Sequence, residues 1–290
     1  MLRIVILATL VLTVLTPGYA EDWTIRVPGS FFSMAGDGQG NTYLLNQQNE
    51  IIVIAADKSC KTVKLPRLME SRPEDRFCDL VVADGKVWLC GFPFPVVFEM
   101  DLAKLDEYKV IRSSDQEIAS LNLLNLHRNG TELLVKDADG YLFVLENNQP
   151  LRKMPKNMAM PAGPAGQKYL LPLVLAMGDL PGYAVFNEKK NLVWTAPAKV
   201  AGKKLKSVEF LGVDRKGQNI FLTVAGHAEL DTEFTLFAVK KGKAVNHRQI
   251  KAPIDLEMQH FCRLTPDGSI LVAEPAANGK MAVVLRRFDL

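Results

Sequence analysis

Short glycine-containing turns that join two apolar strands recur along this chain at intervals of about 45 residues. Each turn is followed at once by a short run of mostly apolar residues, as a strand requires. Six copies can be recognised, with turns at 37–40, 83–85, 128–130, 177–179, 215–217 and 266–268. A period of this size in a chain of short strands is typical of a β-propeller, in which each repeat forms a four-stranded blade. The repeat therefore predicts an all-β fold, a six-bladed β-propeller.

The two ends of the repeat array are predicted to complete each other. The sixth repeat offers only three strands, at 261–264, 270–273 and 281–287, whereas residues 23–27 form a strand without a partner before the first repeat. Pairing 23–27 with 281–287 would close the ring in the last blade and leave no open sheet edge. Residues 21–290 then form one propeller domain. A β-sandwich and an open solenoid are the alternative architectures.

The first 20 residues have the layout of a secretory signal peptide. Arg3 precedes an apolar run at 4–15, which is short for a membrane span, and small residues stand at Gly18 and Ala20. Cleavage after Ala20 would release a secreted or periplasmic protein with no membrane span, and an uncleaved anchor is the alternative. The balance of 35 basic and 32 acidic residues lacks the excess expected of a nucleic-acid-binding surface, so no nucleic-acid partner is predicted.

Four cysteines in an exported chain raise the question of disulfides. Cys78 and Cys90 flank the turn at 83–85, so they lie directly opposite each other if the loop has three residues. A loop of two residues displaces them by one position. A Cys78–Cys90 disulfide is therefore one prediction, and two buried thiols are the other.

The repeats resemble those of secreted six-bladed β-propellers in a loose sense, a group that includes TolB-like, NHL-repeat and gluconolactonase-like proteins. The resemblance is clearest at 265–273, where Thr-Pro-Asp-Gly precedes Ser-Ile-Leu-Val-Ala, and it extends over the whole mature chain. It implies the propeller fold, and the lactonase-like members imply a divalent ion held by oxygen ligands at one mouth of the central channel. Asp-Gly turns of this kind occur in propellers of many functions.

A mixed ring of side chains is expected where the inner strands begin. Counting eight positions back from the turn glycines gives Phe32, Phe77, Asn122, Glu209 and His260. In a metal-dependent hydrolase of the lactonase or esterase type, Asn122, Glu209 and Asp255 would supply oxygen ligands to one divalent cation such as calcium. Glu209 and His260 are the candidate catalytic residues of that reading. Phenylalanine in the first two repeats does not fit a complete metal site.

Long loops on the expected ligand face favour binding over catalysis. The loops at 67–76, 113–120, 155–167, 225–233 and 251–259 exceed what a turn needs. Apolar side chains beside charges suit a contact surface, and the candidate partner-binding residues are Met69, Phe92, Phe94, Met158, Met160 and Met258. The sequence thus favours an exported, non-enzymatic binding or scaffolding propeller with no cofactor, for a protein or small-ligand partner. The metal-dependent hydrolase is the alternative.

Overall fold

A computed structural model gives the fold and describes residues 23–65, 76–83, 85–92, 96–112, 123–129, 132–137, 142–145, 152–153, 169–170, 182–187, 192–197, 199–200, 202–204, 208–224, 233–241, 243–251, 260–276 and 282–290. Every regular element in these residues is a β-strand, as the turn-and-strand repeat predicts. In these ranges there is no helix with the length and apolar character needed to cross a membrane.

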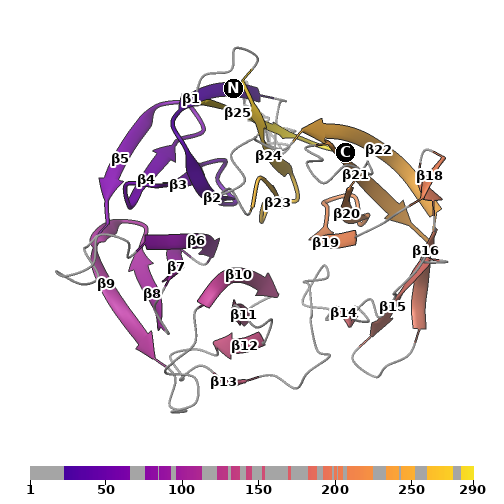
Figure 1. The fold of residues 1–290 in the computed structure, drawn as a ribbon, viewed down its shortest axis with the longest axis horizontal. Helices are drawn as coiled ribbons and strands as arrows, with labels where there is room; N and C mark the ends of the chain where they lie inside the picture. The colour runs from indigo at the N-terminus through magenta and orange to yellow at the C-terminus, as the bar shows by residue number, and fades with distance from the viewer. Residues whose placement is uncertain are drawn as a thin grey trace, which may run out of the picture.

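The strands form antiparallel sheets that are arranged one after another around a central axis (Figure 1). The first three complete sheets contain β2 (Phe31–Gly36), β3 (Thr42–Asn46), β4 (Glu50–Ile54) and β5 (Cys60–Lys64); β6 (Arg76–Ala83), β7 (Lys86–Phe92), β8 (Val96–Asp101) and β9 (Lys104–Arg112); and β10 (Leu123–Asn129), β11 (Glu132–Asp137), β12 (Leu142–Leu145) and β13 (Arg152–Lys153). Sequential strands pair within each sheet, so every sheet runs outward from the axis as a meander.

The remaining strands continue the ring. They are β14 (Tyr169–Leu170), β15 (Gly182–Asn187) and β16 (Leu192–Pro197); β17 (Lys199–Val200) and β18 (Lys203–Lys204); β19 (Val208–Val213), β20 (Asn219–Val224), β21 (Glu233–Lys240) and β22 (Lys243–Lys251); and β23 (Cys262–Leu264), β24 (Ile270–Pro275) and β25 (Ala282–Phe288). β1 (Trp23–Pro28) adds to this last group, where it pairs antiparallel with β25 and places Trp23 opposite Arg287. The sheet order β1-β25-β24-β23 therefore joins the two ends of the described chain.

Burial falls from the inside of a sheet to its outside. The inner strands β2 and β3 are buried at every residue, whereas the outer strand β5 is exposed at all residues but Val63. The outer strand β22 is exposed over most of its length and begins at Lys243. Inner strands covered on both faces need apolar residues throughout, and lysines on an outer strand discourage pairing with other chains.

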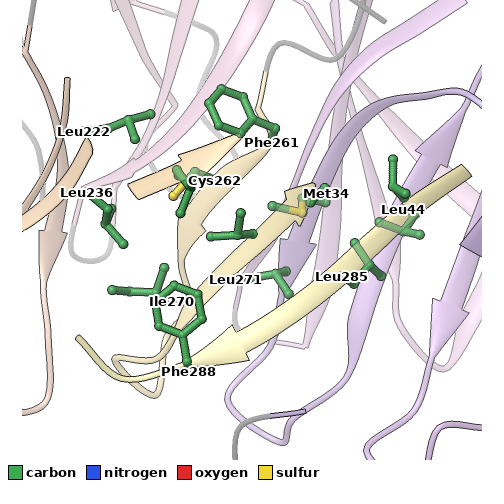
Figure 2. Close-up of a cluster of buried hydrophobic side chains, with 14 of the residues drawn as sticks. Met34, Leu44, Leu222, Leu236, Phe261, Cys262, Ile270, Leu271, Leu285 and Phe288 are labelled. Atoms are coloured by element: carbon green, nitrogen blue, oxygen red, sulfur yellow. The ribbon is translucent and has the colours of Figure 1, made fainter. Parts of the chain in front are cut away.

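The apolar core lies between neighbouring sheets. One cluster joins the last sheet to its two neighbours, with Met34 and Leu44 on one side and Leu222 and Leu236 on the other (Figure 2). A second cluster joins the β2–β5 sheet to the β6–β9 sheet, and a third joins β6–β9 to β10 and β11. Each sheet is thus stabilised by burial against its neighbours, at about 25 cal/mol per Å² of apolar surface.

Two of the repeated turns are stabilised by a carboxylate that accepts hydrogen bonds from the backbone of its own turn. Asp37 Oδ1 accepts hydrogen bonds from the amides of Gln39 and Asn41, both at 2.9 Å. Asp214 Oδ1 accepts the equivalent pair from Lys216 at 2.9 Å and Gln218 at 2.7 Å. Aspartate is favoured at these positions because its short side chain satisfies amides that the turn leaves unpaired.

A buried arginine joins the last sheet to the first. The Arg287 side chain is 2 % exposed, and its Nη2 donates to Asp267 Oδ1 at 2.8 Å and to the Asp37 carbonyl oxygen at 3.4 Å. The same seam contains a parallel bridge between Ser33 and His260. Contacts between the two sheets therefore reinforce the β1–β25 pairing.

Most strand boundaries follow the sequence, with small departures. The outer strand of the second sheet begins at Lys104, because a tight turn anchored by Asp101 pairs Asp101 directly with Lys104. In the fourth repeat, the described inner strand is Tyr169–Leu170, and residues 171–176 lie outside the described ranges. The signal peptide at 1–20 also lies outside them.

Candidate functional site

Four of the inner strands contain an irregularity in their pairing. The pairing register shifts in β2 between Phe31 and Ser33 and in β6 between Phe77 and Asp79. Further shifts occur in β10 between residues 123 and 125, and in β19 between residues 210 and 212. A β-bulge inserts one extra residue and redirects the side chains that follow it. In β2 and β6, the residues after the bulge are the polar Ser33 and Asp79.

One oxygen of the Asp79 carboxylate binds three donors. Asp79 is completely buried, and its Oδ1 accepts from Ser33 Oγ at 2.5 Å, from Arg263 Nη2 at 2.7 Å and from the Leu80 amide at 2.8 Å. Ser33 lies on β2 and Arg263 on β23, so this oxygen alone connects three sheets. A charge that is fully removed from water requires this kind of compensation.

The other oxygen brings in a fourth sheet. Asp79 Oδ2 accepts from the Leu126 amide on β10 at 2.6 Å and from His260 Nε2 at 3.1 Å. Arg263 extends the link, because its Nη1 also donates to the Leu126 carbonyl oxygen at 3.4 Å. We call Asp79 and its side-chain partners Ser33, His260 and Arg263 the Asp79 hub.

The hub keeps its carboxylate ionised. Burial acts to raise the pKa of Asp79, but the charges of Arg263 and His260, with hydrogen bonds from His260 and the Leu126 amide, outweigh it and hold the pKa well below its ordinary value. A carboxylate offers about four acceptor positions, and five donors already converge on this one. The hub is therefore built to hold strands together, with no acceptor position left for a metal ion or for accepting a substrate proton.

The depressed pKa of Asp79 predicts a specific pH dependence. Because the folded value lies below the ordinary one of about 3.9, the stabilisation is complete above that pH and is lost as pH falls towards the folded pKa. Urea midpoints measured between about pH 2 and pH 7 should fall more steeply below about pH 4 in the wild type than in Asp79→Asn. Asp267, whose pKa is also lowered, is common to both proteins and serves as the background. Parallel curves would contradict an ionised Asp79 in the folded protein.

Of the ring counted from the turn glycines, His260 belongs to the hub. Phe32 and Phe77 do not belong to it, which corrects their expected position at the channel mouth: both are core residues between the first two sheets. Phe77 packs edge-on against Phe98, with ring centroids 5.2 Å apart. The backbone of Glu209 pairs with Leu222, and its side chain is not among the described ones.

Most of the other candidate residues lie outside the described ranges, and their roles stay predictions. They are Asn122 and Asp255 of the expected metal site, and Met69, Phe94, Met158, Met160 and Met258 of the expected partner surface. Phe92 ends β7, where its backbone pairs with Arg76. Among the described residues, no three or more His, Cys, Asp and Glu side chains are grouped so that they could hold a metal ion.

The cysteine pair follows the two-residue alternative. Ala83 pairs with Lys86, so Cys90 lies opposite Asp79, and Cys78 occupies the bulge. Both residues are thiols in the structure, and Cys78 Sγ donates to the Cys90 carbonyl oxygen at 3.7 Å. The disulfide stays a prediction.

Sequence reasoning missed Asp79, Ser33 and Arg263 because it counted from the glycines. The first turn separates the paired residues Gly36 and Thr42, whereas the second separates Ala83 and Lys86. The same number of positions before the glycine therefore corresponds to different positions in the ladders of the two strands. A better signal was present. Ser33 and Asp79 are single polar residues inside apolar inner strands, and they lie 46 residues apart.

Comparisons with known proteins add to the fold. No protein-family model matches the chain, and no curated protein matches it in sequence. A chain of the mitotic checkpoint complex superposes with a TM-score of 0.58 at 10 % identity, over 92 % of this chain and 95 % of that one. U3-55K gives 0.56 at 8 % identity, over 91 % and 98 %. The WD40 β-propeller domain of Doa1 gives 0.48 at 10 % identity, over 92 % and 95 %. Likeness at such low identity bears on fold alone. The two superpositions with TM-scores above 0.5, together with the ring of meandering sheets, show that the chain is an all-β protein with a β-propeller fold.

Proposed function

We propose that this protein is an exported, six-bladed β-propeller that acts as a rigid scaffold for a protein partner and needs no cofactor. The observation that carries the proposal is the Asp79 hub together with the Leu126 amide, through which strands of four sheets meet at one buried carboxylate. A ring held at its centre in this way keeps its inner strands in fixed positions. The loops between sheets can then vary in length and sequence without loss of the fold, as in other scaffolds that present binding loops.

We also propose that the propeller has six blades and that its ring is closed by the N-terminal strand. Five four-stranded sheets and the β14–β16 sheet give six units among the described residues, with the β17–β18 hairpin beside them. Pairing of β1 with β25 supplies the fourth strand of the last unit. Export rests on the layout of residues 1–20, in which an apolar run is followed by small residues at a cleavage position.

A protein partner is proposed because the long loops of the sequence combine methionines with charged residues. Methionine side chains are unbranched and polarizable, so they can fit partner surfaces of different shapes. The candidates are Met158 and Met160 in one predicted loop, Met258 in another, and Phe94 in the Phe-Pro-Phe-Pro segment at 92–95. In the described residues, by contrast, the large apolar side chains that are strongly exposed are Tyr108 and Val245.

The test is partner capture by matched variants. The mature protein carrying Met158→Ser and Met160→Ser should lose a cross-linked partner that the wild type captures from its own cell envelope or medium. Val245→Ser, which changes a side chain that is 51 % exposed on the outer strand β22, should capture the same partner as the wild type. Identical capture by all three proteins would contradict the proposed loop surface.

The divalent metal content of the same protein distinguishes the proposed scaffold function from the alternative hydrolase function. The scaffold predicts no stoichiometric divalent metal after gentle dialysis and no thermal shift on addition of calcium, zinc or manganese. One ion per chain that is lost in Glu209→Ala would overturn the scaffold and favour the metal-dependent hydrolase. A screen of lactones and esters would then follow.

A further inference from the structure

Two cysteines meet at the bulge that carries the hub aspartate. Cys78 is the inserted residue of β6, Asp79 follows it, and Cys90 on β7 lies opposite. Cys78 Sγ lies 3.7 Å from the Cys90 carbonyl oxygen, and both side chains pack on the apolar cluster that includes Leu126 of β10. The two thiols are therefore neighbours on the same side of the sheet.

The two thiols differ in access. Cys90 is completely buried, and this burial, with the hydrogen bond and charge of the adjacent Cys78 thiol, raises the pKa of Cys90 well above its ordinary value. Cys78 is only partly buried, so a reagent can reach it. The other two cysteines are elsewhere, Cys60 exposed on the outer strand β5 and Cys262 buried on the inner strand β23.

We infer that Cys78 and Cys90 form a reversible redox site, in which a disulfide across β6 and β7 locks the bulge that positions Asp79. The bulge is the reason that the two cysteines lie close to each other. It sets two residues of β6 against one of β7, so Cys78 reaches Cys90 although the register places Asp79 opposite that residue. The inference does not depend on the proposed scaffold function.

The chemistry is thiol–disulfide exchange with a small disulfide as oxidant. The Cys78 thiolate attacks one sulfur of glutathione disulfide, which forms a mixed disulfide and releases one glutathione thiolate. Cys90 passes its proton to the released glutathione thiolate, and its sulfur then attacks the Cys78 sulfur, which forms the internal disulfide and releases the second glutathione. In total two protein thiols are oxidised, one glutathione disulfide is reduced to two glutathione thiols, and the protons of the protein thiols pass to those products. Dithiothreitol reverses the reaction.

The disulfide would have two effects: it would lower the conformational entropy of the unfolded chain, and it would restrain the bulge in the folded protein. The cysteines are 12 positions apart, a short loop for which a disulfide is expected to raise the Tm by about 5 °C in a chain of this size. Because Asp79 follows Cys78 directly, the bond would also limit movement of the carboxylate that holds four sheets. The redox state of the pair would thereby set how firmly the centre of the ring is held.

Peptide mapping tests the site directly. The full chain is reduced, freed of reductant, incubated in glutathione buffers of increasing oxidation, and blocked with an alkylating reagent before digestion. Trypsin cuts after Arg76, Lys86 and Lys104, so the cysteines fall in the separate peptides 77–86 and 87–104. Oxidation should join these two peptides, lower the intact mass by about 2 Da and raise the Tm, and dithiothreitol should reverse all three changes. The matched control Cys60→Ser should behave like the wild type.

Two variants keep the outcome unambiguous. Cys78→Ser and Cys90→Ala should each abolish the joined peptides and the redox-dependent part of the Tm, whatever their own stability. A stable glutathione adduct on Cys78 with no joined peptides would overturn the inference, because it would show that Cys90 cannot complete the exchange. Joined peptides that form only in urea, or no reaction at Cys78, would overturn it equally.

Discussion

Replacement of Asp79 with alanine is expected to destabilise the protein by about 3–5 kcal/mol. The variant would leave the guanidinium of Arg263 without its carboxylate at 2.7 Å and remove the acceptor of the Ser33 hydroxyl and the Leu126 amide. Loss of one partner from a buried charged network costs far more than loss of an exposed ion pair, because the remaining groups stay desolvated. Urea unfolding at neutral pH, followed by circular dichroism, measures the change.

A matched control separates the hub from an ordinary loss of charge. Glu107→Gln breaks an ion pair with Lys104 in which the Glu107 side chain is 71 % exposed, and it should cost less than about 0.5 kcal/mol. The double variant Asp79→Leu with Arg263→Met should be more stable than the sum of its single changes predicts, by about 1 kcal/mol or more, since it removes both charges together. A cost for Asp79→Ala no larger than that of the control would show that the hub does not hold the sheets.

The second large effect is expected at a turn glycine. Gly217 and Gly268 occupy the same position in neighbouring turns, with φ of 70° and 79°. Alanine at Gly217 would meet nothing within 4 Å, whereas a Cβ at Gly268 would lie 2.4 Å from the backbone nitrogen of Arg215. Both alanines pay about 1 kcal/mol for the left-handed conformation. Gly268→Ala must also separate two packed turns, so it should cost about 2 kcal/mol more than Gly217→Ala.

Thermal unfolding of the two alanine variants measures this difference. Because the conformational cost is shared, the difference in free energy of unfolding isolates the contact between neighbouring sheets. Equal effects of the two substitutions would mean that the turn at Gly268 does not press on Arg215. The Gly85→Ala variant, with φ of 75° and open space around it, provides a second reference in the β6–β7 turn.

The strands could be predicted from the sequence because they depend on interactions between residues that are close together in the chain. An apolar run after an Asp- and glycine-containing turn specifies both the pairing and its place in the repeat, as at Asp214, whose carboxylate binds the amides of its own turn. The partner of 23–27 could be inferred for a different reason. An unpaired strand and an incomplete last repeat complement each other, and β1 pairs with β25 in the structure.

The hub could not be predicted by the same means, because it depends on side-chain direction. One inserted residue at Cys78 changes which side chain of β6 turns to the axis, and the insertion leaves no mark in the pattern of apolar residues. Phe77 was therefore expected where Asp79 lies. The polar residues Ser33 and Asp79 at a spacing of 46 were visible in the sequence. Arg263 was not, because it contacts Asp79 from a position 184 residues further along the chain.

The contacts that are most distant in sequence also predict an order of assembly. Arg263 and Asp79 are separated by 184 residues and Arg287 and Asp37 by 250, so we expect these bonds to form after the intervening sheets. Forming a contact between residues so distant in sequence costs a large loop-closure entropy. Such contacts are therefore poor candidates for a folding nucleus. We therefore expect the hub to slow unfolding and to have little influence on the folding rate.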